Sequence, residues 1–443
     1  MRLLLYALLS TSIAIIAAPV PVTNTNSSGP GSLDNAITTA LAGDTIVFQI
    51  PGTGPFVIIP TSDLPDINKQ LTIDGYTQTG AAPANGLTPA TILIEIQAPN
   101  STIAGLHFVA GSSGSVVKGL AINSCTFTPA ILIEESNIVV SGNYLGMNAQ
   151  GTTSLPNMAG VIIFQADNNT IGGLPSADRN IISGVNQSLN ANPFVLGSGA
   201  NVAVIGNNNS VIGNYIGTNP AGTAALGVSE VGVFVYTGNI NDITNNLISG
   251  NTMAGIVLGN ADRFGQQGSS LSSTRVENNR IGTDVSGLLA IPNGFGISLC
   301  GNADNTVFTE NTISGNLYAG IQIGTFAVNQ QFGDNPPVQG PTTLTLNNIG
   351  TDLPGVNALP NNSYGVVINE ATSNTTVGSN NSALANIISA NRLHGISISS
   401  QATFNTVVGN KIGVNKTTTQ ALGNQLAGIS IGGLTKAASN NAV

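Results

Sequence analysis

The residues of this chain that could take part in acid–base or metal chemistry are few and scattered. The 443 residues include 20 Asp and Glu, 11 Lys and Arg, and two His. A glycoside hydrolase, for example, needs two carboxyl groups about 5–9.5 Å apart across the bond that it cleaves. In a solenoid of stacked coils, such geometry requires acidic residues at matching phases of adjacent coils.

Four aspartates recur at nearly constant intervals in the middle of the chain. Asp242, Asp262, Asp284 and Asp304 are separated by 20, 22 and 20 residues, and Arg263 directly follows Asp262. An aligned row of their carboxylates would form a catalytic site, with Asp262, Arg263, Asp284 and Asp304 as candidate residues. However, the number of residues between each aspartate and its nearest strand-like segment differs, so the four aspartates do not occupy equivalent positions in their coils. Solvated turn positions are therefore the favoured interpretation.

Other acidic residues give weaker signals. Asp63, Asp66 and Asp74 lie early in the chain, and Asp74 precedes a glycine, which indicates a turn with a metal role as the alternative. Glu134 and Glu135 are adjacent, but neighbouring residues of a strand point to opposite faces. We therefore do not expect them to share a proton.

The composition excludes some classes of partner. Only 7% of the residues are charged, the net charge is −9, and no basic cluster occurs. Nucleic-acid binding needs concentrated positive charge, so we expect no nucleic-acid partner. Without linkers, charge runs or Pro-rich hinges, one elongated domain is the simplest organisation.

Short sequence motifs recur along the chain and predict its fold. The motif Asn-x-[Ile/Leu]-Gly begins at Asn143, Asn214, Asn279, Asn347 and Asn410, at steps of 71, 65, 68 and 63 residues. The motif Asn-x-Ile-Ser alternates with it, and Gly followed by alternating apolar residues recurs as well, as in Gly255-Ile-Val-Leu. We expect each unit to form three coils of about 21–24 residues.

These motifs favour parallel strands over the competing repeat folds. Four-residue segments with two apolar side chains on one face become stable only when the next coil covers that face. Glycine at the strand start would allow a corner with positive φ, and asparagines would stack between coils. Helical repeats lack the required 3.6-residue periodicity here, and a β-propeller lacks its hairpin signals. The fold class is therefore all-β, a right-handed parallel β-helix solenoid.

The two ends of the chain differ from its middle. Residues 1–18 resemble a secretory signal peptide cut near Ala17 or Ala18, with an uncleaved N-terminal anchor as the alternative. Residues 19–45 form an N-terminal cap with a short helix, N-capped by Ser32 and carrying Leu33, Ile37 and Leu41 on its apolar face. Residues 46–443 are β-helix repeats, without a C-terminal cap.

The paired histidines and cysteines lie too far apart to act together. His107 and His394 would be about thirteen coils apart, and Cys125 and Cys300 about eight, far beyond the ~7 Å limit for a disulfide. We expect both thiols to be free and buried.

Several parts of the sequence resemble bacterial secreted β-helix repeat proteins. They are the cap at residues 22–33, the segments at 44–48 and 71–78, and the motifs Asn-x-Ile-Gly-Thr, Ile-Ser-Gly-Asn and Gly-Ile-x-Ile. These proteins belong to the pectate-lyase-like superfamily, and the resemblance covers roughly residues 22–433. It implies the fold, and it transfers no catalytic residue. The superfamily includes lyases, hydrolases and epimerases, and a lyase of this type would use Ca²⁺ held by carboxylates, with an arginine base.

Two functional hypotheses follow. The first is an exported, non-enzymatic protein of the cell surface with an adhesive or structural role, which needs no cofactor. The alternative is a carbohydrate-active enzyme of the lyase, hydrolase or epimerase type, and only this alternative calls for Ca²⁺. Both hypotheses place the protein outside the cell or on its surface, with glycans or surface proteins as partners and no transmembrane segment beyond the signal peptide.

Overall fold

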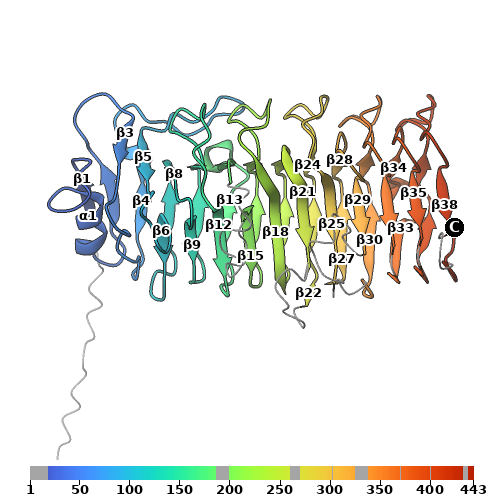
Figure 1. Cartoon of the computed structure of the whole chain (residues 1–443), viewed down its shortest axis with the longest axis horizontal. Helices are drawn as coiled ribbons and strands as arrows, with labels where there is room; N and C mark the ends of the chain where they lie inside the picture. Colours follow the sequence, from blue (N-terminus) through green and yellow to red (C-terminus); the bar gives the residue numbers. More distant parts are fainter. Residues whose placement is uncertain are drawn as a thin grey trace, which may run out of the picture.

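The chain winds into a rod of stacked coils. A computed structural model of the protein describes residues 18–185, 199–259, 270–301, 303–324, 338–369, 371–399, 401–432 and 438–443. Each coil adds one short strand to each of three parallel sheets that run along the rod (Figure 1). The fold is a right-handed parallel β-helix with one short α-helix, which confirms the predicted fold class.

We call the three sheets A, B and C, in the order in which each coil visits them. Sheet A contains β1 (Pro19–Val22), β2 (Thr45–Phe48), β4 (Thr72–Asp74), β7 (Val116–Lys118), β10 (Val139–Ser141), β13 (Thr170–Gly172), β16 (Ser210–Ile212), β19 (Asp242–Thr244), β23 (Arg275–Glu277), β27 (Thr306–Thr309), β30 (Thr342–Thr345), β33 (Thr375–Gly378) and β36 (Thr406–Val408). Sheet B contains β3 (Phe56–Ile58), β5 (Ile94–Gln97), β8 (Leu120–Asn123), β11 (Tyr144–Leu145), β14 (Ile181–Ile182), β17 (Tyr215–Ile216), β20 (Leu247–Ile248), β24 (Arg280–Ile281), β28 (Thr312–Ile313), β31 (Asn348–Ile349), β34 (Ile387–Ile388) and β37 (Lys411–Ile412).

Sheet C completes each coil. It contains β6 (Leu106–Phe108), β9 (Pro129–Ile133), β12 (Ala159–Phe164), β15 (Ala200–Ile205), β18 (Ser229–Asn239), β21 (Asn251–Leu258), β25 (Phe295–Leu299), β29 (Ile321–Ile323), β32 (Val366–Ile368), β35 (Ile396–Ile398) and β38 (Ile429–Ile431). Off this path, β22 (Leu271–Ser272) pairs with the end of β18, and β26 (Ala303–Asp304) pairs with β22. The helical elements are α1 (Leu33–Thr39) and the 3₁₀ turns η1 (Gly75–Thr77), η2 (Ser176–Asp178) and η3 (Ser382–Leu384).

One continuous apolar core fills the rod. Each strand directs its alternate side chains inward, as Ile248, Ile281 and Ile313 do in successive strands of sheet B, and all three are fully buried. Strands of two to four residues have too little area to be stable alone. Each coil therefore depends on its neighbours to cover its core side chains.

Asparagine side chains tie the coils together at the corner between sheets A and B. The Oδ1 atom of Asn279 accepts hydrogen bonds from the backbone N and the Nδ2 of Asn246, and its Nδ2 donates to Oδ1 of Asn311 and to the carbonyl of Ile243. We call this row the corner ladder. Its members are Asn143, Asn180, Asn214, Asn246, Asn279, Asn311, Asn347, Asn386 and Asn410.

The corner ladder corrects the predicted coil length. Successive members are 24 to 39 residues apart, so each repeat unit holds two coils and the prediction of three was wrong. The Asn-x-Ile-Gly and Asn-x-Ile-Ser motifs, which we had treated as different positions, occupy the same corner in alternate coils. They differ because a longer loop follows the Gly motif, as between residues 282 and 291.

The glycines at the start of the sheet C strands are required for a different reason from the predicted one. Gly232, Gly255 and Gly296 do not have positive φ. A Cβ atom at Gly255 would instead lie 2.8 Å from the carbonyl oxygen of Gly296, and one at Gly232 would lie 2.4 Å from that of Gly255. These glycines therefore allow the close approach of successive coils.

The predicted N-terminal helix covers the first coil (Figure 1). Ser32 caps α1 by accepting a hydrogen bond from the backbone N of Asn35, and Leu33 and Ile37 are fully buried. Leu41, which we had placed on the apolar face, is 67% exposed because the helix ends at Thr39. Residues 1–17 of the predicted signal peptide lie outside the described residues, and no helix within the described ranges is long and apolar enough to span a membrane.

The two cysteines are free and buried, as predicted. They lie about five strand spacings apart, next to β9 and β25 of sheet C. Burial raises the pKa of both the Cys125 and the Cys300 thiol to about 12. Each thiol is therefore protonated at neutral pH and shielded from reagents.

We expect the substitution Asn279→Ala to lower the free energy of unfolding by about 3 kcal/mol, because it removes four side-chain hydrogen bonds and leaves buried partners unpaired. Urea denaturation followed by circular dichroism measures the change. Asn362→Ala is the control, since Asn362 is exposed and donates its backbone N–H to Asn316. Equal losses in both variants would contradict a stabilising role for the corner ladder.

We expect neither thiol of the folded protein to react with a chromogenic disulfide reagent at pH 8, because Cys125 and Cys300 are buried and their pKa values are raised. In guanidinium chloride, two thiols per chain should react within minutes. The absorbance of the released chromophore measures both reactions. Rapid labelling of the folded protein would show that one of the cysteines is accessible.

Candidate functional site

The structure separates the aspartates that the sequence suggested as a catalytic row. Asp284 lies in the loop between β24 and β25, whereas Asp304 lies in β26, at the corner that leads from sheet C to sheet A. Asp262 and Arg263 lie outside the described residues. Asp242 belongs to β19, on the outer face of sheet A. The aspartates with described positions therefore do not share one site.

Asp284 closes its own loop. Its carboxylate accepts hydrogen bonds from the hydroxyl of Ser286 and from the backbone N atoms of Leu288 and Leu289. Burial alone would raise the pKa of Asp284, but these hydrogen bonds outweigh it and lower the pKa. The same position is occupied in alternate coils by residues that accept equivalent backbone hydrogen bonds: Asn148, Asn219, Asp352 and Asn415.

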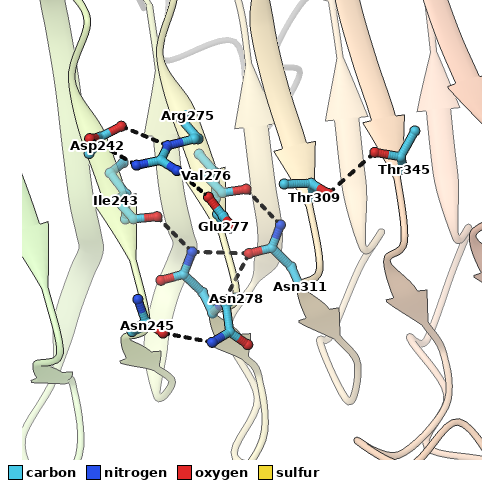
Figure 2. Close-up of polar contacts among 11 residues, drawn as sticks. Asp242, Ile243, Asn245, Arg275, Val276, Glu277, Asn278, Thr309, Asn311 and Thr345 are labelled. Carbon is cyan, nitrogen blue, oxygen red and sulfur yellow. Dashed lines mark hydrogen bonds and ion pairs between the residues drawn. The ribbon is translucent and has the colours of Figure 1, made fainter. Parts of the chain in front are cut away.

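Asp242 takes part in an ion-pair network on the outer face of sheet A (Figure 2). Arg275 donates to both carboxylate oxygens of Asp242, at 3.0 and 3.2 Å, and to Glu277 at 2.5 Å. These side chains are 28–50% exposed, so the ion pairs contribute little to stability. The hydrogen bonds and negative charge of Asp242 raise the pKa of Arg275. The guanidinium is already neutralised and is a poor candidate for binding a further anion.

Other cationic side chains are also used locally. Arg280 donates to the carbonyl of Val285 at 2.7 Å, which ties a loop to sheet B. Arg179 donates to the carbonyl of Gly86 and lies 4.3 Å above the centre of the Tyr215 ring. These contacts give both arginines structural roles.

One cluster brings acid–base groups together from three coils. His107 points outward from β6, between the inward-facing Leu106 and Phe108. Its Nδ1 lies 2.9 Å from Oδ1 of Asp66, and its Nε2 lies 3.1 Å from Oε2 of Glu134. The imidazole side chain is only 12% exposed, whereas those of Asp66 and Glu134 are 52% and 40% exposed. We call these three residues the His107 cluster.

Neighbouring carboxylates stabilise the loops around the His107 cluster. Asp63 accepts hydrogen bonds from the backbone N atoms of Thr102 and Ile103 and from the Thr102 hydroxyl. Burial tends to raise the pKa of Asp63, but these hydrogen bonds lower it overall. Glu135 accepts from the backbone N of Gly111, at 3.0 Å. Glu134 and Glu135 therefore have separate partners, as the sequence indicated.

Each member of the His107 cluster stands out in the sequence, but the predicted coil length does not connect the three residues. Asp66, His107 and Glu134 are 41 and 27 residues apart, and we had assumed coils of 21–24 residues. The pairing of Ile67 with Phe108, and of His107 with Leu132, places the three residues in successive coils. No sequence motif marks this alignment, because the steps of 41 and 27 residues are set by the irregular connections of the first coils.

His394 has a different environment from His107. Its ring stacks on that of Tyr364, with the centroids 5.8 Å apart, and its Nδ1 accepts a hydrogen bond from the backbone N of Ala427. The strand that follows His394, β35, is nine strands from β6 in sheet C, or about 40 Å. The predicted separation of the two histidines into different sites therefore holds, with fewer coils between them than expected.

The described residues contain no group of three or more His, Cys, Asp and Glu side chains arranged to hold a metal ion. In the His107 cluster the imidazole lies between the two carboxylates, so all three groups cannot face one ion. The geometry offers proton transfer instead. Glu134 is within hydrogen-bond distance of a base, His107, which is itself oriented by Asp66.

We expect His107→Gln to fold and to lose no more than about 1 kcal/mol of unfolding free energy, because its two carboxylate partners are half-exposed and water can solvate them. Thermal unfolding followed by circular dichroism provides the measurement, with His394→Gln as the matched control. Loss of the cooperative transition in His107→Gln would instead assign His107 a structural role.

No protein-family model and no curated protein matches the sequence. Among solved structures, a PL6-family polysaccharide lyase from Pseudopedobacter saltans is 15% identical over 91% of this chain and 95% of that chain, with a TM-score of 0.43. The A-module of a mannuronan C-5 epimerase from Azotobacter vinelandii is 12% identical over 96% of this chain and 99% of that chain, with a TM-score of 0.37.

The ORF18 protein of Geobacillus virus E2 is 12% identical over 89% of this chain, with a TM-score of 0.41, and the chain spans 62% of its length. These similarities are weak. The three parallel sheets of the chain itself identify it as a right-handed parallel β-helix protein.

Proposed function

We propose that the protein is exported and acts on an extracellular glycan, with the His107 cluster as its acid–base centre. The observation that carries the proposal is the imidazole of His107, held between the carboxylates of Asp66 and Glu134 on the outer face of sheet C. The sequence alone favoured a non-enzymatic surface role, and this geometry favours the carbohydrate-active alternative.

Each member of the His107 cluster has a distinct role in the proposed reaction. Asp66 holds Nδ1 and fixes the orientation of the ring. Glu134 is half-exposed, so its carboxyl group can reach a glycosidic oxygen. Nε2 of His107 lies 3.1 Å from Oε2 of Glu134 and exchanges a proton with that carboxyl group. When the carboxyl group of Glu134 donates its proton to the leaving oxygen, a water molecule adds to the anomeric carbon and gives up one proton to the imidazole of His107. The imidazolium then returns that proton to the carboxylate of Glu134, which completes hydrolysis of the glycosidic bond.

The charge around the His107 cluster favours a neutral glycan. The carboxylates of Asp66 and Glu134 contact the one imidazole, and Asp63 and Glu135, close to them in the sequence, add two more negative charges. The ammonium of nearby Lys69 donates to the carbonyl of Thr38. A polyuronate would meet like charge here, whereas a neutral sugar would meet many hydrogen-bond acceptors.

Export is the second part of the proposal. Residues 1–18 have the charge, apolar run and small residues of a signal peptide, and the first described residues belong to a folded cap. The low content of charged residues and the buried free thiols are compatible with an extracellular protein.

The test is incubation of the protein with a panel of neutral polysaccharides, followed by a reducing-end assay and mass spectrometry of the products. We expect cleavage of at least one neutral glycan and a rate at least about 100-fold lower in His107→Gln, the usual contribution of general acid–base catalysis. His394→Gln should retain the wild-type rate.

Three outcomes would contradict the proposal. Undiminished cleavage by His107→Gln would remove the His107 cluster from the reaction. Glycan binding without any product, measured on the same panel by affinity electrophoresis, would favour the non-enzymatic surface role. Products absorbing at 235 nm from a uronate polysaccharide would show a lyase with a different substrate class.

A further inference from the structure

The carboxylate of Asp44 is held beside the first described residue of the chain. Asp44 is 5% exposed and follows α1. Its Oδ1 accepts a hydrogen bond from the backbone N of Ala18, at 2.9 Å, and its Oδ2 accepts one from the backbone N of Leu41, at 2.8 Å. Two donors from different parts of the cap thus fix the orientation of this buried anion.

Ala18 is itself part of the folded cap. Its carbonyl oxygen accepts a hydrogen bond from the backbone N of Thr45, at 3.0 Å, and Pro19 pairs with Thr45 at the start of β1 and β2. In a chain that began at Pro19, the ammonium would lie on the proline nitrogen, one residue further along the chain than the donor that Asp44 contacts. A chain that began at Pro19 would therefore lose both the contact with Asp44 and the hydrogen bond from Thr45.

We propose that export is accompanied by cleavage of the bond between Ala17 and Ala18, and that Asp44 is the binding site for the new α-ammonium group of Ala18. The sequence left two cleavage positions open, near Ala17 or Ala18. The contacts of Ala18 favour cleavage after Ala17, which leaves Ala18 as the first residue of the mature chain. The inference depends on the export proposed above, and it is independent of the glycan chemistry.

The reaction is peptide hydrolysis by a leader peptidase of the exporting cell. Water adds to the carbonyl carbon of Ala17, the bond from that carbon to the nitrogen of Ala18 breaks, and Ala17 departs with a carboxylate. The nitrogen of Ala18 keeps its own hydrogen, takes up both protons of the water molecule and becomes an ammonium. An α-amino group has a pKa of about 8, so this ammonium is charged at neutral pH.

Cleavage converts a hydrogen bond from a neutral amide into an ion pair at the same position. The hydrogen bonds from Ala18 and Leu41 already lower the pKa of Asp44, so its carboxylate is charged at neutral pH. An ammonium in place of the amide therefore adds a direct attraction between opposite charges to this hydrogen bond. The mature chain should therefore have a more stable cap than the precursor.

The first experiment expresses the full chain, with its own leader, in a bacterium that has a general secretion pathway. Intact mass and N-terminal sequencing of the exported protein should show a chain that begins at Ala18. A start at Pro19 or at any other residue, or retention of residues 1–17, would overturn the inference.

The second experiment isolates the ion pair. A chain that begins at Ala18, made by removing a cleavable tag, is compared with the same chain extended by one N-terminal serine, which keeps the N–H of Ala18 but moves the charge. We expect the folding equilibrium constant to be about tenfold larger for the chain that begins at Ala18.

The Asp44→Asn substitution, made in both chains, should abolish that difference, and Asp34→Asn in α1 should leave it unchanged. Equal stability of the extended and unextended chains would overturn the role of Asp44. A chain that begins at Ala18 but cleaves no glycan would support the processing site while contradicting the proposed enzymatic function. Glycan cleavage by an exported chain that begins at another residue would support the enzymatic function and contradict the proposed processing site.

Discussion

Hydrogen bonds between equivalent corners of successive coils are the interaction on which the rest of the structure depends. In the corner ladder, each asparagine amide accepts from one neighbouring coil and donates to the other, so a single side chain fixes the register on both sides. The core alone could not do this, because apolar contacts are not directional. With the register fixed, each strand of two to four residues meets an identical strand above and below it.

This dependence explains how the few charged residues are used. Asp284 closes a loop, and Arg280 ties another part of that loop to sheet B. The ion pairs of Arg275 lie on an exposed face and contribute little to stability (Figure 2). A β-helix can vary such outward positions freely, because they take no part in the core or in the corner ladder. The regularity of the fold therefore places few restrictions on where a functional site can lie.

The His107 cluster lies at the N-terminal end of the rod, where the regularity is least. The first coils carry irregular connections, such as the one that contains Asp63 and Asp66, in place of the repeated loops of the later coils. Stacking then brings residues from three successive coils to within hydrogen-bond distance of one imidazole. The same end contains the cap, in which Asp44 is buried between α1 and β1.

The sequence by itself determined the parallel β-helix, the capping helix and the burial of both thiols, because these depend on local periodicity, on capping residues and on polarity. It did not determine the coil length, because Asn246 and Asn279 occur in different motifs yet occupy the same corner. Only the tertiary structure decided which polar residues meet. Whether His107 faces Asp66 and Glu134 depends on the lengths of the intervening loops, and loop length leaves no periodic signal in the sequence.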